Sequence, residues 1–158
     1  MNSERIERKF GNFGIEIIER SAERRISSLY SLVAGRRVCR TYATVKFCLP
    51  VAPELAREHA LVLGGDSIGA VFKEHEWIIN KRPLSVSRLD LATADCIAQA
   101  MRLSAPTRVA LQRYVFTVTK NGSTFEYAAI TEIHHPEHLT ERDLEAEKPG
   151  TCSVGERY

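Results

Sequence analysis

Two short segments of the chain carry residue types suited to binding or transforming a small polar molecule. In 63–69, Leu-Gly-Gly-Asp-Ser-Ile-Gly, glycines, a carboxylate and a hydroxyl stand where an apolar segment ends and a helix is expected to begin. In 125–132, an otherwise apolar strand carries Glu126 and Glu132. An anion-receptive helix start and a carboxylate on a buried strand together predict a pocket for a small polar ligand.

The glycine turn at the start of the expected helix has two interpretations. Gly64, Gly65 and Gly69 would let the backbone approach a ligand closely, and the free N–H groups near Ser67 would favour a carboxylate or phosphate. It is not a phosphate loop, because no Lys-Ser/Thr pair follows the last glycine. An ordinary turn with a helix N-cap explains the same residues about equally well.

Glu132 is the sharper candidate of the two strand glutamates. A strand period of two predicts Glu126, Ala128, Ile130 and Glu132 on one face. If that face lined a closed apolar cavity, the carboxyl would have a raised pKa and could donate a proton or a hydrogen bond. The alternative is a solvated face, which is the commoner situation for a lone glutamate on a strand.

Arginine is the natural partner of a carboxylate ligand, because its guanidinium can donate two parallel hydrogen bonds. The candidates are Arg25 at a strand start, Arg40 within a strand and Arg113 at the start of the late hairpin. Each is also compatible with an ordinary surface position.

The three histidines around Pro136 are the other notable cluster. His134, His135 and His138 follow a strand end without acidic or cysteine ligands at a metal-site spacing. We therefore expect a solvated loop there and no metal site.

The elements that must position these residues are read from apolar periodicity and turn residues. Strands are expected at 14–19, 26–33, 38–49, 77–79, 84–88, 109–119 and 125–133, and helices at 52–61, 67–72 and 90–101. The Asn-Gly turn within 120–123 makes the last two strands the clearest hairpin. We predict one α+β domain at 14–139, an antiparallel sheet with helices on one face. Residues 1–13 are expected as a flexible arm, with one short helical turn as the alternative within 1–12, and 140–158 as a peripheral helix and tail.

Size and composition narrow the function class. The 158 residues suit one domain, and 44% hydrophobic with 27% charged residues is ordinary for a globular protein. A net charge of +2 gives no concentrated basic surface for nucleic acid. No apolar run is long enough to cross a bilayer, and the four scattered cysteines form no zinc or disulfide pattern. We expect a cytoplasmic protein with no membrane or direct nucleic-acid partner.

The order of these segments from about 25 to 138 resembles a known superfamily. Segment 63–72 resembles the Leu-Gly…Pro-Leu-Gly segment of chorismate pyruvate-lyases, and 113–132 resembles their closing hairpin with its terminal Thr-Glu. The pattern Gly122…Glu126-Tyr127 after the 90–103 helix resembles the UTRA effector domains of GntR-type transcription regulators. Both groups belong to the chorismate-lyase-like superfamily, and the resemblance covers most of the chain.

This resemblance implies an antiparallel sheet with a ligand cavity enclosed beneath helical flaps. In the lyases, a glutamate matching Glu132 sits by the substrate, an early-strand arginine holds a carboxylate, and glycine-rich flap backbone covers the ligand. Pyruvate is eliminated from chorismate to give 4-hydroxybenzoate without a cofactor. In UTRA domains the same cavity binds a sugar phosphate or other metabolite and signals to a DNA-binding domain.

The chain departs from that pattern at three places. No arginine stands near Ser28 or Tyr30, so Arg25 is the nearest substitute. Ser67 replaces the expected proline, and the residues before Gly14 are too few for a helix-turn-helix domain.

The favoured hypothesis is a small lyase-like enzyme acting on chorismate or a related aromatic or enolpyruvyl carboxylic acid. It assigns catalysis to Glu132 and Arg25. The expected ligand-binding residues are Gly64, Gly65, Ser67, Gly69, Ser28, Tyr30, Arg40, Arg113 and Glu126. We expect a small anionic metabolite as partner, no cofactor and no metal, with a homodimer left open. The alternative is a non-catalytic, UTRA-like metabolite-binding domain.

Overall fold

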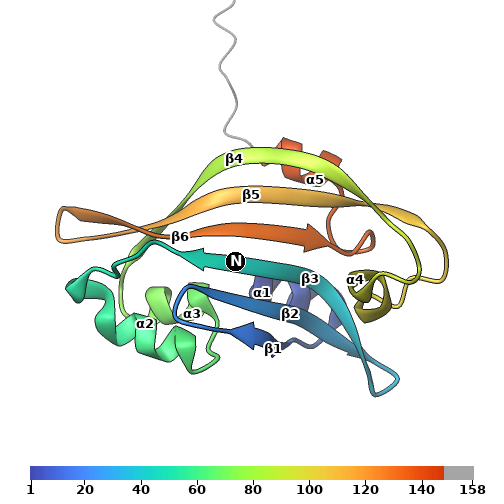
Figure 1. The fold of residues 1–158 in the computed structure, drawn as a ribbon, viewed down its shortest axis with the longest axis horizontal. Helices are drawn as coiled ribbons and strands as arrows, with labels where there is room; N and C mark the ends of the chain where they lie inside the picture. The colour runs from blue at the N-terminus through green and yellow to red at the C-terminus, as the bar shows by residue number, and fades with distance from the viewer. Residues whose placement is uncertain (148–158) are drawn as a thin grey trace, which may run out of the picture.

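The computed structural model describes residues 1–147, which form an antiparallel sheet with short helices packed on it (Figure 1). The strands are β1 (Gly14–Arg20), β2 (Arg24–Val33), β3 (Arg36–Phe47), β4 (Ile78–Leu91), β5 (Thr107–Lys120) and β6 (Ser123–His134). The helices are α1 (Asn2–Phe10), α2 (Ala56–Leu63), α3 (Ile68–Glu74), α4 (Cys96–Ala100) and α5 (Glu141–Ala146), with a 3₁₀ turn at Pro53–Leu55. This confirms the α+β class and the antiparallel sheet.

The six strands lie in the order β1-β2-β3-β6-β5-β4. Two three-stranded units, each connected in sequence, therefore meet along β3 and β6, and every neighbouring pair is antiparallel. After β3 the chain crosses through α2 and α3 to reach the far edge at β4 (Figure 1). This topology puts β3 and β6, with the strands beside them, at the centre of the sheet.

The sheet has two packed faces, which we call inner and outer. The inner face carries Ala43, Val45 and Ile130, and it meets α2 and α3 in the main apolar cluster. Helix α1 lies behind the strands in the view of Figure 1. The outer face carries Cys39 and Ile133, which pack with α4 in a second cluster. The expectation that the helices lie on one face of the sheet was therefore wrong. Helix α4 packs on the outer face, which covers its apolar residue Ala98.

Aromatic side chains dominate the main cluster at the α2–α3 end of the sheet. The Phe72 ring lies 4.8 Å from that of Tyr127 and 5.7 Å from that of Phe116. Phe72 and Tyr127 are almost completely buried, and each such side chain contributes on the order of 1.5–3 kcal/mol of burial free energy. Helix α3 is therefore fixed to the sheet by its apolar side.

Two β-bulges decide which side chains reach the inner face. In β3, Thr41 pairs with Leu29 and Cys39 with Tyr30, so Arg40 is an extra residue. In β6, Ala128 pairs with Phe116 and Glu126 with Thr117, which leaves Tyr127 as the extra residue. A bulge interrupts the alternation of side chains along a strand. The expected single face for Glu126 to Glu132 was therefore wrong.

Three expected elements differ in the structure for identifiable reasons. A single strand, β4, replaces the two expected around Pro83, because an edge strand tolerates the missing N–H and shifts register there. Helix α4 begins only at Cys96, because residues up to Leu91 pair with β5. Residues 2–10, expected within a flexible arm, form α1, which buries Ile6 against the sheet.

Residues 140–147 include the expected peripheral helix, α5, which Thr140 caps by accepting a hydrogen bond from the Asp143 N–H. The expected tail at 148–158 lies outside the described residues.

Candidate functional site

A pocket of about 70 Å³ lies on the inner face, between the first residues of α1 and those of α3. Strands from both halves of the sheet contribute to its wall. Its polar lining residues are Asn2, Ser3, Arg25, Ser27, Ser67, Lys81, Tyr114 and Glu132, and the rest are mainly apolar. An apolar pocket with a few convergent polar groups is typical of a small-molecule site.

Arg25 is the buried cation of this pocket. It is only 3% exposed, and its Nη1 donates to the backbone carbonyl oxygens of Val62 at 2.9 Å and Asp66 at 2.8 Å. Burial lowers the pKa of the guanidinium, while Tyr127 and Asp66 oppose that change. Among the described residues, no carboxylate side chain pairs with it within 4 Å. A buried charge held only by carbonyl dipoles is well prepared to receive an anion.

Two polar atoms of β2 are buried without a hydrogen-bond partner among the described residues. They are Arg25 Nε and Ser27 Oγ, and both residues line the pocket. The two side chains stand on the same face of the strand, because they are two residues apart. Leaving a polar group buried and unpaired costs about 1–3 kcal/mol. Both atoms are therefore candidate donors to a ligand carboxylate.

Glu132 faces the same pocket from β6. It is 7% exposed, and its Oε1 accepts a hydrogen bond of 2.9 Å from the Tyr114 hydroxyl. Burial, together with the neighbouring Glu132 carboxylate, raises the pKa of Tyr114 well above its usual value, so this phenol stays a donor. The other oxygen, Oε2, lies 3.5 Å from His134 Nε2. The carboxylate is thus held on both sides.

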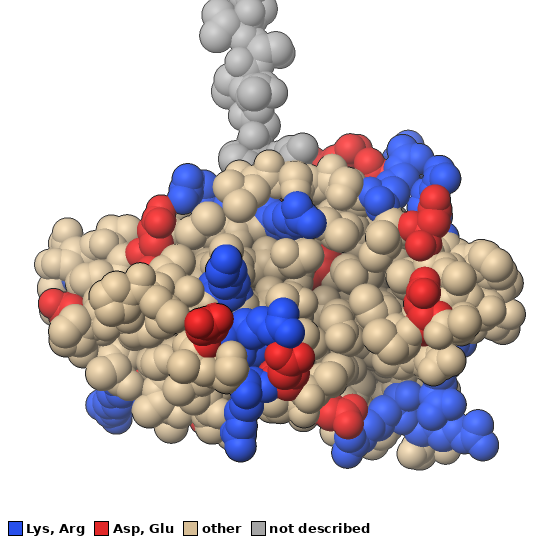
Figure 2. Space-filling model, viewed as in Figure 1, with Lys and Arg blue, Asp and Glu red and all other residues tan. Residues whose placement is uncertain are grey.

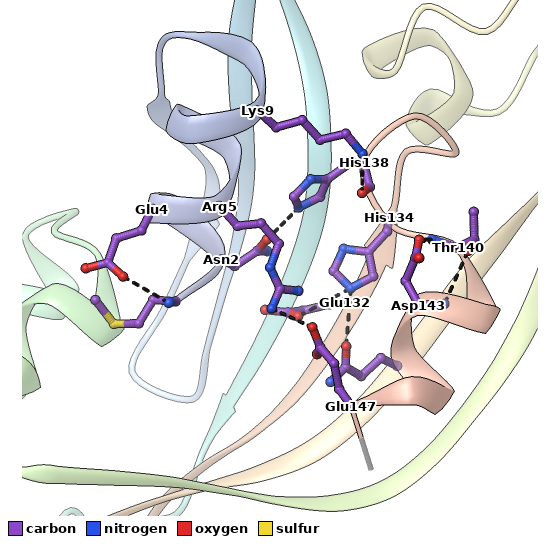
Figure 3. A network of polar contacts seen from close by, with 12 residues as sticks. Asn2, Glu4, Arg5, Lys9, Glu132, His134, His138, Thr140, Asp143 and Glu147 are labelled. Atoms are coloured by element: carbon purple, nitrogen blue, oxygen red, sulfur yellow. Dashed lines mark hydrogen bonds and ion pairs between the residues drawn. The ribbon is translucent and has the colours of Figure 1, made fainter. Parts of the chain in front are cut away.

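His134 connects this carboxylate to α1 through a chain of hydrogen bonds that includes Thr41. Figure 3 shows His134 and Glu132 together with the hydrogen bond between His138 and Asn2. The Nδ1 of His134 lies 2.9 Å from Thr41 Oγ1, which accepts from Asn2 Nδ2 at 2.9 Å. Asn2 Oδ1 in turn accepts from His138 Nε2 at 2.6 Å. Burial lowers the pKa of His134 and His138, the latter to about 3, so both rings are neutral near pH 7. With His134 Nε2 facing the oxygens of Glu132 and Gln112, that nitrogen is the one that carries the proton.

A second pocket of about 360 Å³ adjoins the first. The residues that line both pockets are Met1, Asn2, Ile79, Lys81 and Glu132. Arg5 and Glu147, paired at 2.6 Å, and Gln112 add polar groups to its wall. Glu132 therefore lies where the two pockets meet.

The structure brings some of the expected binding residues to the pocket. Glu132, Arg25, Ser67 and Gly69 line it, whereas Gly64 and Gly65 stand beside it in the turn before α3. Asp66 takes part through its carbonyl oxygen, which holds Arg25.

Other expected residues lie elsewhere. Ser28 and Tyr30 alternate with Ser27 and Leu29 along β2 and do not line the pocket. Arg113 is exposed on β5, and Glu126 is an exposed partner of Arg82 at 2.6 Å. For Ser28, Tyr30 and Arg113 the strand's alternation turns the side chain away from the pocket. For Glu126 the bulge at Tyr127 does so.

Arg40 is buried but serves the docking of α1. Its Nε donates to Ser31 Oγ at 2.9 Å, its Nη1 pairs with Glu137 at 3.0 Å, and its guanidinium lies 3.8 Å from the centre of the Phe10 ring. It does not line either pocket described above.

Sequence reasoning missed Ser27, Tyr114, Lys81 and the N-terminal residues of α1. Ser27 was detectable in principle, since it shares the period-two face of Arg25. Tyr114 and Lys81 become neighbours, with the Lys81 ammonium 4.9 Å from the Tyr114 ring centre, only through the pairing of β4 with β5.

The expectation of a solvated histidine loop was wrong. His134, His135 and His138 are 0%, 6% and 1% exposed, because they pack between α1, β3 and the loop after α4. Within residues 1–147, no group of three or more His, Cys, Asp or Glu side chains is arranged to hold a metal ion.

Among the described residues, the outer face carries charged side chains of both signs. Figure 2 shows basic and acidic side chains interspersed over it, among larger uncharged areas. Among the described residues, no helix has the length and apolar character needed to cross a membrane.

No protein-family model matches the chain, and neither the curated proteins nor the solved structures include a match to it. The case for function therefore depends on the site itself and on the resemblance of its motifs.

Proposed function

We propose that this protein is a chorismate-lyase-like enzyme that eliminates pyruvate from chorismate or a related enolpyruvyl carboxylic acid. The observation that carries the proposal is the pairing of two buried groups in one pocket. Arg25 and Ser27, whose Nε and Oγ have no partner among the described residues, lie on β2, and the Glu132 carboxylate lies on β6. A cationic anchor and a carboxylate across one small pocket suit an acid that must be both held and deprotonated.

In this proposal Arg25 and Ser27 bind a carboxylate of the substrate through Nε and Oγ. Glu132 accepts the proton lost from the ring carbon that bears the hydroxyl. The electrons of that C–H bond complete the aromatic ring as the neighbouring carbon–oxygen bond to the enolpyruvyl group breaks. The departing enolpyruvate takes up one proton and becomes pyruvate, and the ring product is 4-hydroxybenzoate. Confinement and fixed dipoles lower the barrier without a cofactor.

The resemblance of 63–72 and 113–132 to the lyases supports the same fold for this chain. In that arrangement α2 and α3 flank the ligand as flaps, and the closing hairpin β5–β6 presents Thr131 and Glu132. The six-stranded antiparallel sheet and the place of Ser67 and Gly69 in the pocket wall agree with this proposal.

A binding-only function is the second candidate, and one observation favours it. Tyr114 and His134 hold both oxygens of Glu132, and backbone carbonyls hold Arg25. Such restraint suits a rigid receptor for an acid at least as well as a proton-transfer site. In that case the protein is a metabolite-binding domain of the UTRA type without turnover.

Incubation with chorismate and detection of pyruvate by a coupled lactate dehydrogenase assay separates the two candidates. Glu132→Gln should abolish pyruvate release, whereas Glu126→Gln, a matched change on the same strand, should leave it unaltered because Glu126 is exposed and paired with Arg82. Equal release by both variants would contradict the assignment.

A thermal-shift assay tests the binding-only function, in which no pyruvate is released. A rise in melting temperature with 4-hydroxybenzoate or a sugar phosphate, lost in Arg25→Met and kept in Arg113→Met, supports the binding function. If neither pyruvate release nor any thermal shift is seen, both candidates are rejected.

A further inference from the structure

We propose that α1 is the gate of this pocket, and that its first residues form a removable partition between the two adjoining cavities. The inference uses the proposed function in one respect only: a ligand must reach Arg25 and Glu132. Both side chains are less than 10% exposed, at 3% and 7%, so some covering element has to move before a ligand can contact them.

The partition is formed by Met1 and Asn2, which line both pockets. Taken alone, the inner pocket has a volume of about 70 Å³. The smallest typical ligand pockets have a volume of roughly 300 Å³. The adjoining pocket adds about 360 Å³ and shares Ile79, Lys81 and Glu132 with the inner one. Withdrawing the start of α1 would therefore join them into one chamber of ligand size, with Glu132 inside it.

The start of α1 reaches across the pocket to α3. A Cβ placed on Gly69 would collide with the Met1 sulfur, so the side chain of Met1 rests directly on the backbone of α3. Glu4 extends this contact at the surface by pairing with Lys73 at 2.8 Å. Helices α1 and α3 thus meet over the pocket, and one of them has to yield.

Helix α1 is the more weakly held of the two. Among its nine residues, only Ile6 is a buried apolar side chain. Its other attachments are the Met1 contact with Gly69, the Phe10 ring against Arg40, and polar contacts. The polar contacts run chiefly from Asn2 to Thr41 and His138, and from Lys9 Nζ to the His138 carbonyl oxygen at 2.9 Å. By contrast, α3 places Ile68, Val71 and Phe72 in the main apolar cluster. Elements with few buried apolar contacts open first.

A pivot is present at the end of α1. Gly11 ends the helix in a left-handed conformation with φ of 84°, which glycine adopts without strain. Directly after it, the Asn12 side chain is fixed to β2, donating to the Leu32 carbonyl oxygen at 3.2 Å and accepting from the Leu32 N–H at 2.5 Å. The chain is therefore anchored at residue 12, and Gly11 is the point about which the helix before it would turn.

The test measures access to the pocket with a thiol reagent and needs no ligand. In protein with Cys48, Cys96 and Cys152 replaced by serine, Ser27→Cys places a reactive thiol in the pocket wall. Cys39, 1% exposed under α4 on the outer face, remains as an internal reference. Modification of each thiol by methyl methanethiosulfonate is followed by mass spectrometry.

Adding Asn2→Ala, which removes two hydrogen bonds of α1, should accelerate modification at position 27 about tenfold and leave Cys39 unchanged. Lys9→Met, which removes one bond near the pivot, should give a smaller acceleration of the same kind. Lys9 lies outside both pockets, so this second variant also guards against direct effects on the pocket wall.

Two results would overturn the proposal. One is a rate at position 27 that neither variant changes. The other is equal acceleration of both thiols in both variants, since access would then require opening of the whole domain. A protein that binds no acid at all would fail the chorismate and thermal-shift tests and still show gating here, so the two proposals fail separately.

Discussion

Protonation of His138 should loosen α1, and the environment of the ring sets how much folding free energy is lost as the pH falls. The ring is 1% exposed, and its Nε2 donates to Asn2 Oδ1 at 2.6 Å while Nδ1 has no partner among the described residues. A second proton would place an unpaired N–H and a charge there. Burial is the largest cause that lowers its pKa to about 3, followed by the nearby His134, Lys9, Arg5 and Arg40.

The sign follows from the direction of this shift. Because the folded protein holds His138 neutral, the folded state binds fewer protons than the unfolded state below pH 6.5, the ordinary pKa. The contribution of neutral His138 to the free energy of unfolding is fully present above that pH and is lost as the pH falls toward about 3. Each pH unit costs about 1.4 kcal/mol, so the loss between neutral pH and pH 5 is at most about 2 kcal/mol.

Urea unfolding of the protein and of His138→Gln at about pH 7.5 and pH 5 measures this effect. Glutamine keeps a donor for Asn2 and cannot be protonated in this range, so the variant should lose about 2 kcal/mol less on acidification. His59, His134 and His135, whose pKa values burial also lowers, contribute to the acid sensitivity that remains. An unchanged pH dependence in the variant would refute the assignment of this penalty to His138.

Three further substitutions test the pocket wall, with Ser31→Ala as a comparison outside it. Tyr114→Phe removes the buried hydrogen bond to Glu132 and should lower the free energy of unfolding by about 1–2 kcal/mol, measured in urea. Ser27→Ala removes a hydroxyl without a partner among the described residues and should not lower the free energy of unfolding. Ser31→Ala removes the hydroxyl that accepts a hydrogen bond from the buried Arg40 guanidinium, and it should lower that free energy by about 1 kcal/mol. Gly69→Ala raises helix propensity by up to about 1 kcal/mol, yet it should speed hydrogen exchange in α1, because the added methyl displaces the Met1 side chain from α3 and removes that contact. Slower exchange in α1 would contradict the contact.

Local sequence patterns were sufficient for much of the sheet. The Asn-Gly turn, with φ of 52° at Asn121 and 78° at Gly122, joins β5 and β6 as its residue types require. Alternating apolar residues located the early strands to within a few positions, because a half-buried strand imposes that period wherever it lies. The hairpin and the antiparallel α+β class therefore follow from local chemistry.

Helix α1 was not predictable from its composition. Its sequence, Asn-Ser-Glu-Arg-Ile-Glu-Arg-Lys-Phe, holds two apolar residues among charged ones, which is typical of a loose arm. It folds as a helix because the inner face offers a place for Ile6, Arg40 meets the Phe10 ring, and Thr41 and His138 both bond Asn2. These partners come from three distant segments.

The candidate site divides in the same way. The sequence by itself determined that Glu132 occupies a strand, that Arg25 stands at a strand start and that a glycine turn precedes α3. Only the tertiary structure decided that Glu132 faces the pocket while Glu126 faces solvent, since the bulge at Tyr127 depends on how β6 pairs with β5. Likewise, only the tertiary structure decided that Ser27, and not Ser28, lines the pocket from β2. Residue type and period are local properties, whereas the face that becomes a pocket is set by which strands and helices meet across it.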